Sequence, residues 1–432
     1  MHRSPLALLL VLLLLPGLAA CTGDQPEDAA SEDTAATEDV TATARAIHER
    51  VLTLDTHIDI PFNYATDEVD PGVRGDAQVD LPKMEEGGLD AGFFIVYVGQ
   101  TERTPENYEE AKAQAMTKFN AIHRMTDSLY TDRIEMAYTA DDVRRIHESG
   151  KLVALIGIEN GYVIGKDLAL LEKYHTLGAR YITLAHGGHN DIADSSTPRE
   201  NLGDGDEEHG GVSAFGEEVI AEMNRLGIMV DVSHISKQAS LDAMRLSKAP
   251  VVASHSSART LCNHPRNMDD EQLMALKENG GVMQTVAFSA YVKENPPAKT
   301  AALDSLREAF GLTGGGRGAF QNLTEAQRDA YRQQRDALDE RWPAPTVQDF
   351  VDHIDYAVQL IGIDHVGISS DFDGGGGVEG WNDASETFNV TLELVRRGYS
   401  EEDIAKLWSG NLLRVLQANE RVAAELQAAA TS

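Results

Sequence analysis

Short apolar runs alternate with stretches of helical periodicity along most of the chain. Eight such runs fall at Val51–Leu54, Ala91–Val98, Leu152–Ile158, Tyr181–Ala185, Ile228–Val232, Val251–Ala253, Gly281–Val286 and Val366–Ser369. Strands that are buried on both faces of a parallel sheet appear in a sequence as continuous apolar runs. Eight of them separated by helices indicate an α/β fold of the (β/α)8 TIM barrel type, although a doubly wound sheet would give a similar pattern.

Two of the connecting helices can be placed from their periodicity. Residues 215–226 repeat apolar side chains at helical spacing and end before Gly227, and residues 350–361 do the same before Gly362. Residues 298–345 differ, because they form a long, charged stretch that contains three consecutive glycines. We expect this stretch to be an insertion between strands 7 and 8 over one end of the barrel, either as a lid or as a passive surface excursion.

The first residues of the chain have the pattern of an export signal. A basic start is followed by an apolar stretch from Leu6 to Leu15 and by Leu-Ala-Ala-Cys at residues 18–21. The stretch is too short to cross a membrane as a helix, and the last four residues resemble a bacterial lipobox, in which Cys21 becomes the lipidated first residue. An ordinary cleaved signal is the alternative. We expect an exported lipoprotein, held on the membrane by its lipid, whose folded part is periplasmic or extracellular.

The segment that follows is acidic. Residues 22–43 hold seven acidic residues and no basic one. A segment of this composition cannot bury enough apolar area to order itself, so it predicts a flexible tether. The expected organisation is a signal peptide over residues 1–20, a lipidated tether over 21–43, one folded domain over 44–420 and a C-terminal tail over 421–432.

The charge balance excludes several classes of partner. The 432 residues include 37 Lys and Arg against 70 Asp and Glu, which gives a formal net charge of −33. A nucleic-acid backbone must be met by clustered basic side chains, so we expect no nucleic-acid partner. Electrostatic docking on anionic lipid is unfavourable for the same reason. The chain has only two cysteines, which excludes a disulfide framework.

Residue types that bind metal ions stand at the ends of six of the eight runs. They are His57, Asp59, Glu159, His186, His234, His255 and Asp371. In a barrel of this kind the carboxyl ends of all strands open onto one mouth, so these side chains would point into one cavity. A lone histidine at a strand end is more often a cap or a hydrogen-bonded core residue. Its repetition at four strand ends is not needed by a packed core and favours a metal site.

The spacing of these residues suits two ions. His57 and Asp59 alternate along an extended segment, so both side chains can reach one ion. His234 and His255 would supply a pair of nitrogens from neighbouring strands, and Glu159 is placed to bridge the two ions. Imidazole and carboxylate ligands suit zinc or a similar divalent ion, and two such ions can together bind a hydroxide at neutral pH.

The motifs THID, GIEN, DVSH, ASHS and SSDFDG, in this order, resemble those of the membrane (renal-type) dipeptidases, which are dinuclear zinc peptidases of the amidohydrolase type. The segments FGEEVIAEMNRLGIMVDVSH and GNLLRVL are also similar to that family, and the resemblance runs from about residue 48 to 417. It implies a (β/α)8 barrel that holds two Zn²⁺ ions per chain and hydrolyses dipeptides by a metal-bridging hydroxide. It also implies that His57 and Asp59 hold one ion, that His234 and His255 hold the other, and that Glu159 bridges them.

Three further roles follow from the resemblance. It implies that His186 contacts the substrate near the scissile carbonyl, that Arg266 in HPRNMDD binds the terminal carboxylate of the substrate, and that Asp371 is the catalytic acid/base. His189 and Asp191 are expected to be loop residues near the substrate. The length of the insertion departs from the family pattern, and so does Thr285–Phe288, which lacks the aromatic-rich pattern expected after the seventh strand and leaves side-chain specificity open.

Rival functions stay open at this point. Another dinuclear hydrolase, acting on a lactam, lactone or phosphoester, would share the metal ligands but would leave Arg266 nothing to bind. A metal-binding surface lipoprotein without catalysis would not need Asp371 or His186, and a pure interaction protein would not need the imidazole cluster. The sequence does not decide the oligomeric state, for which a homodimer is one alternative.

Overall fold

The structure is a computed structural model that describes residues 39–312 and 323–431. The predicted signal peptide, the predicted lipidation site Cys21 and most of the predicted tether lie outside the described residues, as do the three glycines of the insertion. Within the described part of the chain, no helix is both long enough and apolar enough to cross a membrane.

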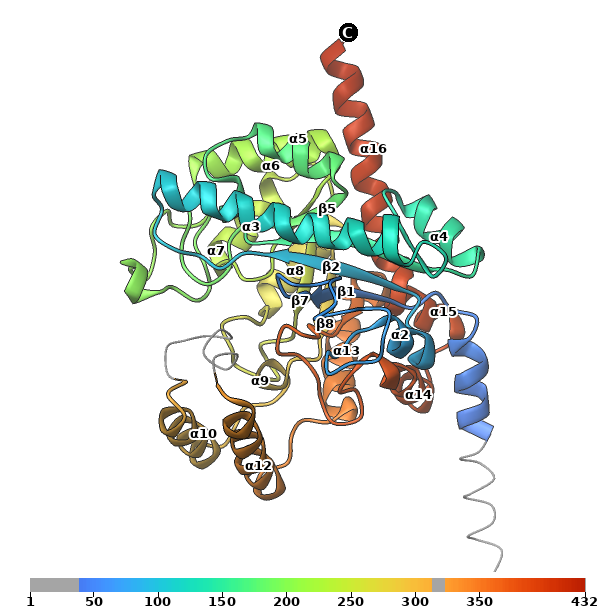
Figure 1. The fold of residues 1–432 in the computed structure, drawn as a ribbon. Coiled ribbons are helices and arrows are strands. Elements are labelled where there is room, and N and C mark those ends of the chain that lie inside the picture. Colours follow the sequence, from blue (N-terminus) through green and yellow to red (C-terminus); the bar gives the residue numbers. More distant parts are fainter. Residues whose placement is uncertain (1–38, 313–322, 432) are drawn as a thin grey trace, which may run out of the picture.

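A barrel of eight parallel strands forms the centre of the fold (Figure 1). The strands are β1 (Leu54–Asp59), β2 (Ala91–Tyr97), β4 (Leu152–Glu159), β5 (Ala179–Thr183), β6 (Met229–Asp231), β7 (Val252–Ser256), β8 (Val282–Val286) and β9 (Val366–Ser369). Each strand pairs with the next in this order. The amide of Asp59 donates to the carbonyl of Phe372 over 2.9 Å, so the first strand meets the chain just past the last one. All eight predicted strands and the (β/α)8 architecture are confirmed.

Two details of the sheet differ from the prediction. The first strand lies later in the chain than the apolar run that predicted it, because its residues LDTHID are all buried although most are polar. A further short strand, β3 (Ile134–Met136), pairs only with β4. Its three residues, with a half-exposed Glu135 at the centre, form no apolar run, so the sequence pattern did not indicate it.

Helices surround the strands (Figure 1). They are α2 (Leu81–Gly87), α3 (Pro105–Arg124), α4 (Ala140–Glu148), α5 (Ala169–Thr176), α6 (Ala214–Leu226), α7 (Lys237–Leu246), α8 (Asp270–Asn279), α9 (Ser289–Val292), α10 (Pro297–Ala309), α12 (Glu325–Arg341), α13 (Val347–Ile361), α14 (Phe388–Arg396), α15 (Glu401–Ala405) and α16 (Asn411–Thr431). Both helices predicted from periodicity are present, as α6 and α13. Gly227 ends α6 in the left-handed conformation (φ 84°), which glycine adopts without strain.

Helices reach both ends of the described chain. Residues 39–48 are helical, so residues 39–43 of the predicted tether belong to an ordered helix, whose Ala44 and Ile47 are buried against the domain. At the other end, α16 continues through the predicted tail to Thr431, and Figure 1 shows its last turns projecting from the barrel. Its first turns bury Leu412 and Leu416 among the apolar side chains that fill the barrel interior.

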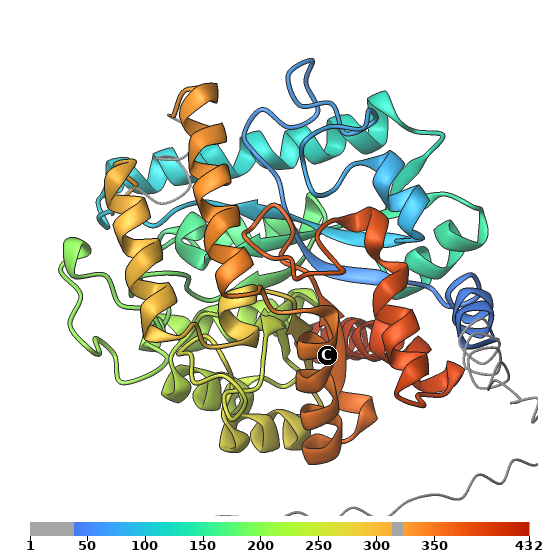
Figure 2. The ribbon, with the colours of Figure 1, turned by 90° about the horizontal axis from the view of Figure 1, so that it is seen from below.

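The predicted insertion forms two helices, α10 and α12, that lie side by side (Figure 2) and below the strands in the view of Figure 1. It lies between β8 and β9, as predicted. No residue of α12 is buried, and α10 buries only Lys299 and Leu306. The ammonium of Lys299 joins the two helices, since it donates to the carbonyl of Trp342 (2.8 Å) and lies 2.9 Å from Asp339 Oδ1. None of the described residues of these two helices lines the cavity at the carboxyl ends of the strands, which supports the surface-excursion alternative.

Candidate metal centre and substrate cavity

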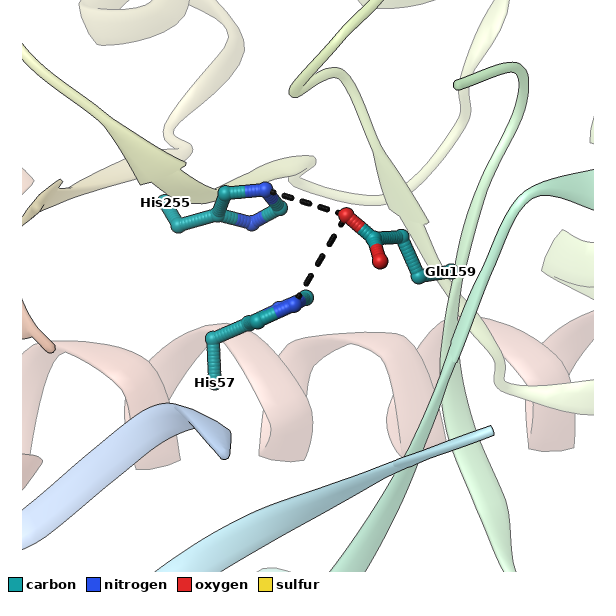
Figure 3. A group of neighbouring side chains, drawn as sticks. All are labelled: His57, Glu159 and His255. Carbon is teal, nitrogen blue, oxygen red and sulfur yellow. Dashed lines mark ion pairs between the residues drawn. The ribbon is translucent and has the colours of Figure 1, made fainter. Parts of the chain in front are cut away.

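The carboxylate of Glu159, the last residue of β4, lies among four imidazoles. Its Oε1 is 3.0 Å from His234 Nε2, 3.4 Å from His186 Nε2, 3.4 Å from His255 Nε2 and 3.7 Å from His57 Nε2. Figure 3 shows how His57 and His255 each direct a ring nitrogen at this one oxygen. Strand ends that are far apart in the chain therefore meet at one carboxylate, as the sequence predicts.

Two more carboxylates complete the cluster where β1 meets the chain after β9. His57 Nε2 is 3.7 Å from Asp59 Oδ2. His57, Asp59 and Asp371 each place one potential metal-binding atom so that the three atoms lie within 4.8 Å of one another. Glu159, His186 and His234 form a second group of three whose potential metal-binding atoms also lie within 4.8 Å of one another. Every predicted metal ligand is thus brought together, and proximity also places His186 and Asp371 among the ligand-type groups.

The hydrogen bonds behind His255 turn its Nε2 into the cluster, where it lies 2.7 Å from Nε2 of His234. The hydroxyl of Ser254 donates to Asp231 Oδ2 over 2.7 Å, so it must accept from Nδ1 of His255, 2.8 Å away. Asp231 is fully buried and also accepts from the hydroxyl of Thr183 and the amide of Ser233. A hydrogen-bonded carboxylate behind a histidine is the arrangement that orients metal-binding imidazoles.

A corresponding arrangement stands behind His57. The hydroxyl of Tyr181 donates to the carbonyl of Thr56 over 3.0 Å and accepts from Nδ1 of His57 over 2.9 Å. This leaves Nε2 of His57 buried with no hydrogen-bond partner. The Tyr181 ring fits only because residue 157 is glycine, since a Cβ there would lie 2.2 Å from the ring.

The electrostatics of the cluster favour a cation. Burial acts to raise the pKa of Glu159, but the neighbouring His186 and His57 outweigh it and hold this pKa well below its usual value. Burial lowers the pKa of His234 and of His255 well below the usual value, so both rings are neutral. For His57, burial is outweighed by the charge of Glu159 and its neighbours, which raise the pKa, so metal binding there would displace a proton. Inward-facing nitrogens around an ionised carboxylate fit divalent metal ions such as zinc.

Backbone strain is concentrated at this centre. Five residues other than glycine have positive φ in the described part of the chain, and four of them lie at or beside the cluster: Asn160 (84°), His234 (68°), Asp371 (58°) and Asp373 (57°). Such conformations cost about 1–3 kcal/mol each and persist only where the surroundings enforce them. The strain here therefore accompanies side chains that are held in place for a function.

The cluster opens into a cavity of about 460 Å³. The cavity is lined by Asp59, Tyr97, Glu159, His186, Gly187, Thr197, Arg199, His234, His264, Arg266, Phe288, Tyr291, Asp371 and Gly374. The rings of Phe288 and Tyr291 stack at 4.2 Å, so the wall after β8 is aromatic. Residues 285–288 contribute only Phe288 to this wall, and the second ring, Tyr291, comes from α9.

Arg266 reaches the cavity almost fully buried, with 4% of its surface exposed. Its Nη2 donates to the carbonyl of His255 over 3.0 Å, and its guanidinium lies 5.4 Å from the ring centre of Tyr291. Nε has no hydrogen-bond partner. A guanidinium held in this way offers its remaining donors to an anionic group in the cavity.

His186 stands between the cluster and the cavity wall. Its ring centre is 4.0 Å from that of His234 and 4.8 Å from that of Tyr97. Burial, aided by the charges of Arg266 and Arg199, lowers the pKa of His186 to about 4. The ring is therefore neutral at neutral pH and carries a single proton that it can donate to a ligand.

His189 and Asp191 do not line the cavity. Nδ1 of His189 accepts from the amide of Ser195 and Nε2 donates to the carbonyl of Gly205, both over 3.0 Å. Asp191 lies 3.1 Å from the ammonium of Lys166. Both hold the long loop between β5 and α6, as expected of loop residues.

Several cavity residues were not predicted from the sequence. They are Tyr97, Gly187, Thr197, Arg199, His264, Phe288, Tyr291 and Gly374. For one of them a sequence signal was available: Gly187 directly follows His186 in LAHGGHND. Tyr97 ends strand β2 inside a predicted run. The remaining residues belong to loops and a short helix whose approach to the cavity depends on the assembled barrel.

Comparison with known proteins agrees with this geometry. The family model described as membrane dipeptidase (Peptidase family M19) matches residues 41–430. Dipeptidase tcpJ of Claviceps purpurea is 34% identical over 351 residues, which cover 80% of this chain and 70% of the relative. Dipeptidase verJ of Clonostachys rogersoniana is 30% identical over 388 residues, covering 87% of this chain and 86% of the relative.

Solved structures agree as well. The crystal structure of the probable dipeptidase PvdM from Pseudomonas aeruginosa matches with a TM-score of 0.79 at 35% identity, over 89% of this chain and all of that one. A metallo peptidase from Rhodobacter sphaeroides, at 22% identity and a TM-score of 0.66, shares the fold over 85% of this chain and 99% of its own.

Proposed function

Because the chain belongs to the membrane dipeptidase family, peptidase family M19, it is a metallopeptidase that acts on dipeptides, and we propose that it does so with two zinc ions. The observation that carries this proposal is the convergence of four ring nitrogens on Glu159 Oε1, within 3.0 to 3.7 Å, in a buried cluster with two further carboxylates.

The donor set supports a division into two sites that share one ligand. His57 and Asp59 would hold one ion, His234 and His255 the other, and Glu159 would bind both. When bound, the two ions would supply Lewis-acid chemistry: they would polarise the scissile carbonyl and lower the pKa of water, so that hydroxide would be available as the nucleophile at neutral pH.

The remaining roles belong to the side chains of the cavity. Arg266 pairs with the terminal carboxylate of the dipeptide and so fixes its direction. Neutral His186 donates to the carbonyl oxygen of the scissile bond, where negative charge develops. Asp371 accepts the proton of the attacking water and passes it to the leaving amine. Its side chain is 7% exposed and packs against Gly374 beside Asp59.

Metal analysis together with a substrate screen tests this function. The purified protein is assayed against a library of L,L- and L,D-dipeptides while its zinc content is measured. We expect about two zinc ions per chain, hydrolysis that stops on chelation, and recovery when zinc is added back. Fully zinc-loaded protein that hydrolyses lactams or lactones but no dipeptide would refute the proposal.

We also propose that the protein is a lipoprotein exported and anchored through Cys21. The support is the Leu-Ala-Ala-Cys sequence after an apolar stretch and the acidic segment that follows it. Expression of the full chain and of Cys21→Ser, followed by fractionation, tests the anchor. We expect only the unchanged chain in the membrane fraction; equal membrane association of both would contradict the anchor.

A further inference from the structure

A second guanidinium lines the cavity besides that of Arg266. Arg199 lies in the loop between β5 and α6, immediately before the 3-10 turn Glu200–Leu202. Its side chain packs against Gly187, where an added Cβ would lie 2.8 Å from both Nε and Nη2 of the guanidinium. The absence of a side chain at position 187 therefore gives the Arg199 head group its place beside His186.

The charge of Arg199 has no partner within the described part of the chain. No described carboxylate lies within 4.0 Å of its guanidinium, although the chain has 70 acidic residues against 37 basic ones. Arg103, which contacts the same loop, shows the usual pattern, since its guanidinium lies 2.6 Å from Glu208 and 3.8 Å from Asp191. An arginine without a counter-charge in the wall of a cavity is suited to an anionic group of a ligand.

The main chain of Arg199 is nevertheless fixed. Its amide donates to Asp204 Oδ2 over 2.8 Å, and the same oxygen accepts from the amide of His189 over 2.9 Å. The carboxylate of Asp204 is thus engaged with the backbone rather than with the guanidinium. The loop holds the side chain at the cavity while its donors stay available.

The two guanidiniums come from different parts of the barrel mouth. Arg266 is tied to the carbonyl of His255 at the end of β7, whereas Arg199 rests on the loop after β5. The positive charges of both arginines help to lower the pKa of His186, whose imidazole lies where we propose that the scissile bond binds. A dipeptide whose terminal carboxylate is bound by Arg266 leaves Arg199 for another acidic group.

We propose that Arg199 binds a second carboxylate of the substrate, so that this dipeptidase prefers dipeptides with an aspartyl or glutamyl side chain. The inference rests on the proposed function, since it takes Arg266 as the site of the terminal carboxylate. Planar, two-point pairing between guanidinium and carboxylate gives both the attraction and the selection against uncharged isosteres.

A comparison of isosteric substrates tests this preference. The kcat/KM of the zinc-loaded protein is measured for Ala-Glu against Ala-Gln and for Glu-Ala against Gln-Ala. In at least one pair we expect the acidic peptide to be favoured by about tenfold or more, and the ratio to fall to about one in Arg199→Gln. Arg199→Lys keeps the charge without the fork and should retain part of the ratio. Arg103→Gln, which removes a paired cation that contacts the same loop, should leave the ratio unchanged.

A binding measurement separates recognition from turnover. In zinc-loaded Asp371→Asn, calorimetric titration with the favoured acidic peptide and its amide isostere should give the same order of affinity, and Arg199→Gln in that background should remove the difference. Equal values for acidic and neutral peptides in the unchanged protein would overturn the inference while leaving the dipeptidase function intact. A loss in Arg199→Gln that is equal for all peptides would also overturn it. Failure to hydrolyse any dipeptide would overturn the proposed function itself.

Discussion

The carboxylate of Asp55 in β1 accepts hydrogen bonds from both the amide (3.0 Å) and the hydroxyl of Ser370, the residue that follows β9. It also accepts from the amide of His57 over 3.2 Å. One fully buried carboxylate thus joins the strand that carries His57 and Asp59 to the residue before Asp371. We call this junction between Asp55 and Ser370 the seam of the barrel. The seam and the geometry of the site depend on the same carboxylate.

Replacement of Asp55 by Asn should therefore affect stability and activity together. An amide cannot accept at both positions, so at least one buried donor loses its partner, which costs about 1–3 kcal/mol of unfolding free energy. Urea unfolding, kcat and zinc content are measured beside Asp132→Asn, an exposed control. Unchanged stability in Asp55→Asn would show that the seam does not depend on this carboxylate.

Gly374→Ala should impair catalysis with little effect on the fold. An added Cβ would lie 1.7 Å from Asp371 Oδ1 and 2.5 Å from Asp59 Oδ2, so both carboxylates must move. We expect kcat to fall by roughly tenfold to a hundredfold, since displacement of reacting groups by about 1 Å has effects of that size. Gly75→Ala, where the nearest atom is 3.9 Å away, is the matched control. Equal activity of the two variants would contradict the proposed placement of Asp371.

Asp371→Asn should retain both zinc ions and lose turnover. The amide cannot carry the proton from water to the leaving amine, and general acid–base catalysis is typically worth about 10²–10⁴-fold. Metal analysis and kcat are measured on the same preparation. Near-normal turnover at full zinc content would remove Asp371 from the mechanism.

Arg266→Met should raise KM for dipeptides by about tenfold or more, because a charge-assisted hydrogen bond to the terminal carboxylate is lost. The effect should be much smaller for a dipeptide amide, which has no such carboxylate. The comparison of the two substrates in both proteins is the measurement. An equal rise for both would indicate a structural effect, since Arg266 also contacts His255.

His353 predicts a loss of stability in acid. In α13 its Nδ1 accepts from the amide of Ala258 (3.1 Å) and its Nε2 donates to the carbonyl of Val292 (2.8 Å), so the folded protein holds the neutral ring. Burial lowers its pKa from the usual 6.5. Below that value the unfolded chain takes up a proton that the folded protein does not, so this contribution is complete above pH 6.5 and declines as the pH falls.

Urea unfolding of the unchanged protein and of His353→Gln at about pH 8 and about pH 5 measures this effect. Both proteins retain the metal-site residues, so the pH dependence of that site cancels in the difference between their unfolding free energies. The unfolding free energy of the unchanged protein should exceed that of the variant by less at the lower pH. A difference that stays constant with pH would contradict the assignment.

The sequence predicted the barrel well because its strands are buried on both faces. Seven of the eight strands coincide closely with apolar runs. The eighth, β1, was placed too early because it contains buried polar residues: the carboxylate of Asp55 accepts a hydrogen bond from the amide of His57, and neither residue belongs to an apolar run. The helices at the two ends of the described residues could not be predicted, because the burial of Ala44 and Leu416 depends on surfaces formed elsewhere in the fold.

The residues of the site also differ in how well the sequence predicts them. Candidate ligands at strand ends, such as Glu159 and His255, could be predicted because the barrel fixes where strand ends meet. Arg199 and Tyr291 could not, because a long loop and a short helix bring them to the cavity, and their distance from a strand end says nothing about where they point. The side-chain selectivity proposed for Arg199 therefore depends on a part of the sequence that local patterns do not explain.

The seam between Asp55 and Ser370 also sets an order of events during folding. The bond joins residues 315 positions apart, so it closes one of the longest loops in the chain, and such contacts form slowly. The proposed metal ligands from His57 to His255 are all present well before the final strand, whereas Asp371 arrives only with it. On the proposed mechanism, a chain that has been made only as far as β8 could gather the proposed ion-binding residues but would lack Asp371, so peptide hydrolysis would await completion of the whole barrel.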